Sequence, residues 1–178
     1  MGPADQLTVA RMAAAPVIVA LFAIDFDGHE YWATALFAVA MATDWVDGWL
    51  ARRSGSSSAM GSLLDPVADK ILVLSVLIVL LGEGVFAGWV VAAIVAREFL
   101  VSGLRLAALE RGVVLGARDL GKLKTWTQSI AAILGGFAAA GAIDESIAWW
   151  ALIVALVVTW VSGLDYARLA PRLLRSPA

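Results

Sequence analysis

Long apolar segments constrain the fold of this chain more than any other feature of its sequence. Six runs of mostly apolar residues alternate with short polar breakers, and each run has roughly the 20 residues that an α-helix needs to cross a membrane. Of the 178 residues, 61% are hydrophobic and 16% are charged, against roughly half and a quarter in soluble domains. The sequence therefore predicts an all-α integral membrane protein, with six transmembrane helices in a single domain over residues 1–178. The six segments are Leu7–Ile24, Tyr31–Leu50, Leu63–Leu81, Phe86–Leu109, Leu120–Ile143 and Ile147–Leu169.

Charged residues divide between the two sides of such a bundle. Connections 25–30, 82–85 and 144–146 contain six acidic residues and no Lys or Arg, whereas all thirteen basic residues lie on the other side or toward it. Because basic residues collect on the cytoplasmic side, we predict a multi-pass protein of the cell (inner) membrane with both termini in the cytoplasm. We expect membrane lipids, and not nucleic acid, as its surroundings. Gly135, Gly136 and Gly141 in the fifth segment are expected to allow close helix approach.

Four aspartates conflict with this apolar background, because one ionised carboxylate near the bilayer centre costs about 2.5–3.5 kcal/mol. Asp44 and Asp47 are three residues apart, and Asp65 and Asp69 are four apart, so each pair shares one face of a helix. The pairs stand at the predicted cytoplasmic ends of consecutive antiparallel helices, where they converge. The predicted site therefore lies on the cytoplasmic side of the membrane.

Carboxylates gathered in this way either keep protons or bind cations. All-oxygen ligands favour Mg²⁺, Mn²⁺ or Ca²⁺ over zinc, and two such ions about 3.5–4 Å apart clamp a displacement at phosphorus. The residues between the acids suit a nucleotide: Gly48 and Gly61 permit close approach, Arg52 can grip phosphate, and Ser58 offers a hydroxyl.

The pattern Asp44-x2-Asp47-Gly48-x2-Ala51-Arg52-x8-Gly61-x3-Asp65-x3-Asp69 resembles the signature of the CDP-alcohol phosphatidyltransferases at every defined position. The resemblance extends over most of the chain. Three further segments are similar to the bacterial phosphatidylglycerophosphate synthases of that family, namely 64–70, 96–99 and 121–125.

This resemblance implies a six-helix homodimer that transfers the phosphatidyl group of CDP-diacylglycerol to an acceptor hydroxyl, here that of glycerol 3-phosphate. It implies two divalent cations, Mg²⁺ or Mn²⁺, with Asp69 doubling as the base for the acceptor hydroxyl. Near the chain start the family commonly has Asn-x-x-Thr-x-x-Arg, of which Thr8 and Arg11 match while Asp5 replaces the amide. The implied metal ligands are Asp44, Asp47, Asp65 and Asp69, and the implied CDP-diacylglycerol site is Thr8, Asp47, Gly48, Ala51, Arg52, Ser58 and Gly61.

The phosphate of the acceptor requires a second cationic site. Arg105 and Lys124 are the first candidates, and Glu98 is expected to be an ion-pair partner beside Arg97. Other enzymes with this signature use inositol phosphate, phosphatidylglycerol or other alcohols, and a divalent-cation transporter is a remote alternative. The remaining phosphate candidates are Arg118, Lys122 and Arg97.

Overall fold

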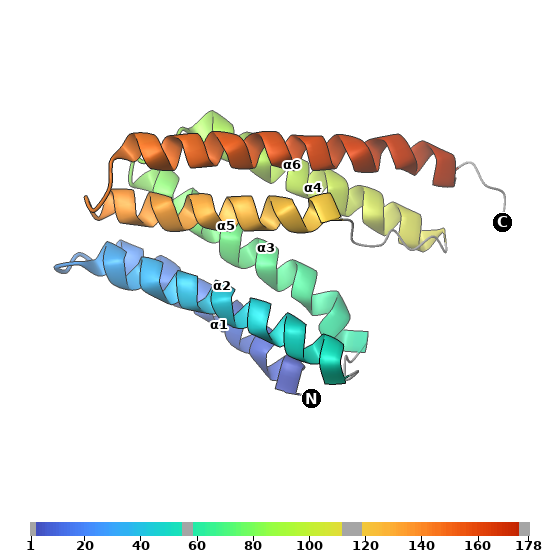
Figure 1. Cartoon of the computed structure of the whole chain (residues 1–178), viewed down its shortest axis with the longest axis horizontal. Helices are drawn as coiled ribbons and strands as arrows, with labels where there is room; N and C mark the ends of the chain where they lie inside the picture. Colours follow the sequence, from blue (N-terminus) through green and yellow to red (C-terminus); the bar gives the residue numbers. More distant parts are fainter. Residues whose placement is uncertain (1–2, 55–58, 112–118, 175–178) are drawn as a thin grey trace.

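Six α-helices form the part of the chain that the computed structural model describes (Figure 1). The backbone is described over residues 3–54, 59–111 and 119–174, and the side chains over 9–43, 67–111 and 120–168. The six predicted helical segments are thus confirmed, although several helices continue past the apolar runs that predicted them. The helices are α1 (Pro3–Ala23), α2 (His29–Ser54), α3 (Ala59–Gly82), α4 (Gly88–Glu110), α5 (Asp119–Ala139) and α6 (Glu145–Leu174).

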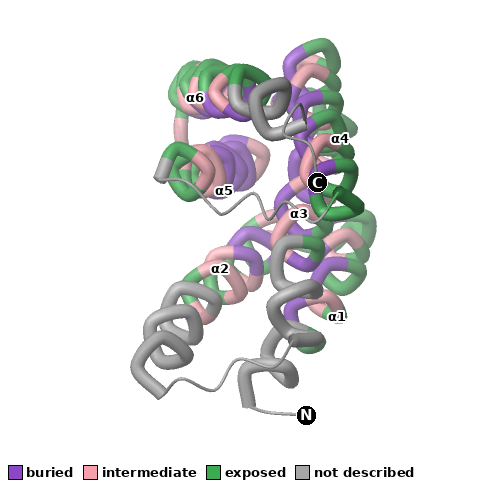
Figure 2. Tube along the Cα trace, turned by 90° about the vertical axis from the view of Figure 1, so that its right-hand side faces the viewer, coloured by how far each residue is buried: buried purple, intermediate pink, exposed green. Residues whose placement is uncertain are grey.

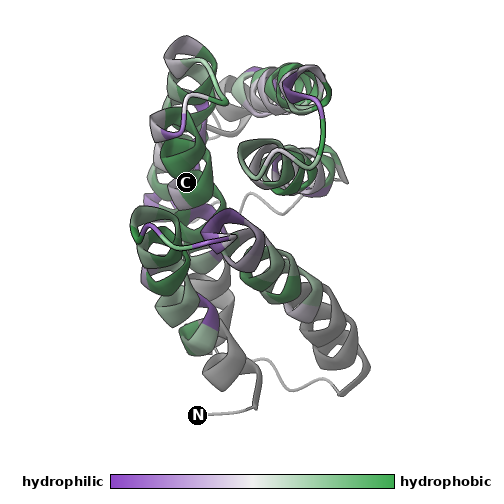
Figure 3. Cartoon of the chain, turned by 90° about the vertical axis from the view of Figure 1, so that its left-hand side faces the viewer, coloured by the Kyte–Doolittle hydropathy of each residue, from purple (hydrophilic) through white to green (hydrophobic). Residues whose placement is uncertain are grey.

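Successive helices run in opposite directions, so the short connections alternate between the two ends of the bundle (Figure 1). Connections 24–28, 83–87 and 140–144 share one end, and Figure 3, which looks onto this end, shows hydrophilic residues in them. Each of the three contains a glycine with a left-handed backbone, at Gly28, Gly84 and Gly141 (φ 77°, 78° and 69°). Gly141 therefore serves a turn beyond the end of α5 and not the helix contact expected of it, because that conformation favours a residue without a Cβ.

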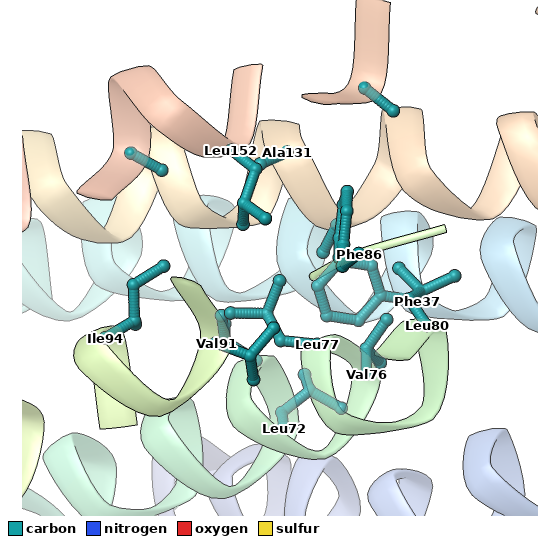
Figure 4. Close-up of a cluster of buried hydrophobic side chains, with 14 of the residues drawn as sticks. Phe37, Leu72, Val76, Leu77, Leu80, Phe86, Val91, Ile94, Ala131 and Leu152 are labelled. Carbon is teal, nitrogen blue, oxygen red and sulfur yellow. The ribbon is translucent and has the colours of Figure 1, made fainter. Parts of the chain in front are cut away.

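The apolar core fills the half of the bundle next to these connections. It combines the second halves of α1, α3 and α5 with the first halves of α2, α4 and α6, and includes Phe37, Leu77 and Leu152, all 0% exposed. Figure 4 shows these side chains packed together with Leu80, Phe86 and their neighbours. The half toward the chain ends is different, since most of the buried polar residues lie there, including Arg97, Glu98, Gln128, Thr159 and Ser162.

The six helices pack in two groups that are in contact with each other. α1 packs on α2 and α3, α6 packs on α4 and α5, and α5 joins the two groups through α2 and α3. The glycines of α5 allow the last contact, as predicted for Gly135 and Gly136: a Cβ at Gly136 would lie 2.0 Å from Oγ1 of Thr34 on α2. The separation of α2 from α5 therefore depends on the absence of a side chain at residue 136.

Large apolar side chains cover the outside of the bundle, whereas buried residues face inward (Figure 2). Trp32, Trp89 and Trp150 are 66%, 63% and 66% exposed and lie near the end that carries the acidic connections, as aromatic belt residues do. Within the described residues, one helix is long and apolar enough to cross a membrane, over Glu145–Arg168. α4 differs because it carries Arg97, Glu98 and Arg105 within its length.

Candidate active site

The predicted aspartates lie on two regular helices. Asp44 and Asp47 are within α2, and Asp65 and Asp69 are within α3, so the three- and four-residue spacings place each pair on one helix face as expected. Of these four side chains, the structure describes that of Asp69. The side chains of Asp44, Asp47 and Asp65 lie outside the described residues.

The predicted CDP-diacylglycerol site falls in the same part of the chain. Thr8 is within α1, and Gly48, Ala51, Arg52 and Gly61 are within α2 or α3, while their side chains are outside the described residues. Ser58 and the acceptor candidate Arg118 lie wholly outside them.

Asp69 forms an ion pair with Arg11 that joins α3 to α1. Nη1 of Arg11 donates to Oδ1 of Asp69 at 2.7 Å, and the two side chains are 4% and 27% exposed. Arg11 is thus buried beneath a carboxylate that still reaches the surface. A guanidinium at this distance forms a charge-assisted hydrogen bond with the carboxylate. This contact therefore holds in place the carboxylate that was predicted to act as the base.

A small cavity lies beside Asp69 between α3, α4 and α5. Two of its wall residues, Lys70 and Lys124, carry ammonium groups, and the hydroxyl of Thr125 and the amide of Gln128 add polar groups. Polar groups that converge on a cavity are the usual form of a small-molecule site. The cavity is lined by Asp69, Lys70, Val73, Leu74, Glu98, Lys124, Thr125 and Gln128.

Glu98 is the centre of a buried hydrogen-bond network on the α4 side of this cavity. Its Oε1 accepts from Nζ of Lys124, from Nη1 of Arg97 at 3.0 Å and from Nε2 of Gln128 at 3.4 Å. The Glu98 side chain is 3% exposed, so it is a buried carboxylate compensated by two cations. The expectation that Glu98 is an ion-pair partner is confirmed.

The network continues into α6. Nη2 of Arg97 donates to Oγ of Ser162 at 2.9 Å, and Nε2 of Gln128 donates to Oγ1 of Thr159 at 2.7 Å. The stem of Arg97 lies against Gly163, where an added Cβ would be 2.9 Å from Nε. Arg97, one of the phosphate candidates, is 2% exposed, and its guanidinium already donates to Glu98 and Ser162.

The remaining basic candidates take different positions. Lys70 donates to Oγ of Ser102, which itself donates to the Glu98 carbonyl at 2.6 Å and so ties Lys70 to the same network. The guanidinium carbon of Arg105 lies 5.5 Å from the centre of the Tyr166 ring, within the range of a cation–π contact. Lys122 is exposed near the start of α5. Of the described phosphate candidates, Lys124 is the one that lines the cavity beside Asp69.

The donor chemistry fits a hard divalent cation, since all four predicted ligands are carboxylates. Asp69 fits this set, because its carboxylate is partly exposed on the cavity wall. In the ranges whose side chains are described, no three His, Asp or Glu residues come together, and three of the four aspartates lie outside those ranges.

Sequence reasoning missed the polar partners on α5 and α6. Gln128 follows Lys124 by four residues, and Thr159 precedes Ser162 by three, so each pair forms a polar stripe on a helix that is otherwise mostly apolar. Such a stripe is the available signal, because polar side chains in membrane helices face the protein interior. It does not reveal which helix the stripe meets.

The chain is similar to proteins of one known family. The family model of CDP-alcohol phosphatidyltransferase matches residues 1–161. The CDP-diacylglycerol--glycerol-3-phosphate 3-phosphatidyltransferase of Bacillus subtilis is 39% identical, over 91% of each chain. A probable phosphatidylglycerophosphate synthase of Mycobacterium tuberculosis is 37% identical over 95% of this chain and 81% of its own. The Escherichia coli K12 protein with the same name as the B. subtilis one is 38% identical over 70% of this chain and 71% of its own. The chain belongs to the CDP-alcohol phosphatidyltransferase family.

Proposed function

We propose that this chain transfers the phosphatidyl group from CDP-diacylglycerol to glycerol 3-phosphate, giving phosphatidylglycerophosphate and CMP. The relatives from B. subtilis and E. coli are named for this reaction. The observation that carries the proposal to this chain is the pair of ammonium groups, of Lys70 and Lys124, in the wall of the cavity beside Asp69.

Both lysines share the cavity wall with two carboxylates, Asp69 and Glu98. Each of these carboxylates accepts from a guanidinium, Asp69 from Arg11 and Glu98 from Arg97. A phosphate monoester carries about −1.5 to −2 near neutral pH, and ammonium groups are strong donors to phosphate oxygens. Two ammonium groups beside the predicted base therefore suit an acceptor that carries a phosphate.

The reaction then uses the residues in the following roles. The carboxylate of Asp69 takes the proton of the acceptor hydroxyl, whose oxygen attacks the phosphorus that bears diacylglycerol. The bond from this phosphorus to the CMP oxygen breaks, and CMP leaves with the bonding electrons. Lys124 and Lys70 hold the phosphate of the acceptor, and Arg52 with the backbone at Gly48 and Gly61 holds the diphosphate. The protein contributes positioning and charge neutralisation, as in phosphoryl transfer generally.

Divalent cations complete this site. Enzymes of this family use divalent metals, and we infer that Asp44, Asp47, Asp65 and Asp69 hold two Mg²⁺ or Mn²⁺ ions here. When bound, the ions offset the charge of the diphosphate and of the leaving CMP.

The family is one of membrane enzymes, and we infer that all six helices of this single domain span the membrane, with both termini and the site in the cytoplasm. The acidic connections at the opposite end and the exposed tryptophans near it support this orientation. We also infer a homodimer, which cysteine cross-linking in membranes would test.

CMP release by the purified protein tests the proposed reaction. CDP-diacylglycerol is supplied with Mg²⁺ or Mn²⁺ and with glycerol 3-phosphate, inositol phosphate, serine or no acceptor. We expect CMP release that depends on glycerol 3-phosphate, together with phosphatidylglycerophosphate identified by mass spectrometry. Equal release with serine, or with no acceptor, would contradict the proposal. Release that depends on inositol phosphate would assign a different acceptor.

A further inference from the structure

Glu98 is an unexpected residue to find in the wall of a site for an anion. A lone carboxylate repels phosphate, yet Glu98 is buried beside Lys124 in the cavity where we place the acceptor phosphate. Its Oε1 already accepts from three side chains, so it is poorly placed to take a proton from a substrate. Its effect on the substrate must therefore pass through the groups that it holds.

We propose that Glu98 is a positioning residue that holds the Lys124 ammonium at the cavity wall and so sets the affinity for the phosphate of the acceptor. This inference rests on the proposed function. It adds a residue outside the aspartate signature that selects phosphorylated acceptors over neutral alcohols.

The first argument concerns the freedom of the lysine side chain. A free lysine side chain populates many rotamers, and part of this freedom is lost when its ammonium binds a ligand. The contact with Glu98 fixes Lys124 before the acceptor arrives, which lowers the cost of binding. An ammonium has three N–H donors, and this contact uses one of them. Donors therefore remain that can reach a phosphate oxygen.

The second argument concerns the rigidity of Glu98 itself. Arg97 links Glu98 to Ser162, and Gln128 links it to Thr159, so two separate bridges fasten this carboxylate to α6. Glu98 therefore cannot follow Lys124 if that side chain moves toward solvent. A carboxylate whose only role was to neutralise charge would not need two bridges to a third helix.

The experiment compares three variants with a matched control. Glu98→Gln keeps the size and one acceptor oxygen but removes the charge, Lys124→Gln removes the ammonium, and the third variant carries both changes. Ser129→Ala is the control, because its buried hydroxyl on α5 donates to the Thr125 carbonyl and does not line the cavity. KM for glycerol 3-phosphate, KM for CDP-diacylglycerol and kcat are measured for each, with thermal unfolding in the same detergent.

We expect Glu98→Gln to raise KM for glycerol 3-phosphate by roughly 10- to 100-fold, which is the range for loss of one charge-assisted hydrogen bond. KM for CDP-diacylglycerol should change by less than about twofold, since only acceptor binding is affected. The double variant should be no worse than Lys124→Gln, because Glu98 acts through that lysine. Ser129→Ala should leave both KM values near those of the wild type.

Several results would overturn the inference: additive effects in the double variant, an equal rise in both KM values, or the same rise in Ser129→Ala. If Glu98→Gln does not fold, Glu98→Asp replaces it, because it keeps the charge but withdraws it by one methylene. An unchanged KM for glycerol 3-phosphate in Glu98→Asp would also overturn the inference. Failure of the proposed function is recognised separately, because the wild-type protein would then show no release of CMP that depends on glycerol 3-phosphate.

Discussion

Replacement of Gly136 by alanine tests how the structure holds α2 against α5. An added Cβ would lie 2.0 Å from Oγ1 and 3.0 Å from Cβ and Cγ2 of Thr34. Thr34 is 1% exposed, and its branched Cβ is fixed by the helix backbone, so rotation about χ1 cannot clear both contacts. The two helices must therefore move apart, and α2 is the helix that carries Asp44 and Asp47.

Two opposing effects decide the size of the change. Overpacking costs about 1–3 kcal/mol, and a clash as close as this one belongs near 3 kcal/mol. Alanine in place of glycine recovers about 1 kcal/mol through its higher helix propensity. The net loss in free energy of unfolding is then about 2 kcal/mol, which corresponds to a fall in Tm of about 4–8 °C for a chain of this size.

Thermal unfolding in detergent micelles measures this loss. Gly103→Ala is the matched control, because it lies inside α4 where an added Cβ meets nothing within 4 Å. It should raise stability by up to about 1 kcal/mol. Thr34→Ala in the Gly136→Ala background should recover most of the loss, and Oγ1 of Thr34 has no hydrogen-bond partner in the described part of the chain that its removal would break. An unchanged Tm for Gly136→Ala, or a loss that Thr34→Ala does not recover, would refute the reasoning.

Three further predictions concern the site and one helix end. Asp69→Asn should lower kcat by at least about 100-fold through loss of the base, while CDP-diacylglycerol binding, measured by competition, persists in part; substantial residual turnover would remove Asp69 from this role. Removal of divalent cations with a chelator should stop CMP release, and Mg²⁺ or Mn²⁺ should restore it; turnover that survives chelation would contradict the metal assignment. At the start of α6, the Ser146 hydroxyl and backbone N–H, the latter 2.8 Å from Oδ1, lower the pKa of Asp144 below its ordinary value. Because the native pKa is lowered, this cap stabilises the fold fully above the unfolded pKa of about 3.9 and is lost as the pH falls through the native value. Asp144→Ala should therefore lower Tm at pH 7 more than Asp144→Asn, which keeps an acceptor oxygen, and equal melting of the two variants would contradict the cap.

The helical segments and the reaction chemistry follow from local features of the sequence. Segment length and apolar content are local properties, so the six helices could be predicted, although not how far α2 and α3 continue beyond their apolar residues. The spacing of Asp44 and Asp47, and of Asp65 and Asp69, is also local, because helix geometry alone places each pair on one face. The signature and the sidedness of the basic residues required no knowledge of which helices touch.

Contacts between residues that are distant in the sequence depend on how the helices pack. Arg11 and Asp69 are 58 positions apart, and Glu98 bonds to partners 26 and 30 positions away on α5. The sequence ranked Arg105 and Lys124 together, whereas the fold puts Lys124 in the cavity wall and Arg105 beside Tyr166. Helix periodicity specifies the face that a side chain occupies, but the neighbour of that face depends on shape complementarity between helices, as between Gly136 and Thr34. That is why the aspartates could be read from the sequence, while the network that holds Lys124 could not.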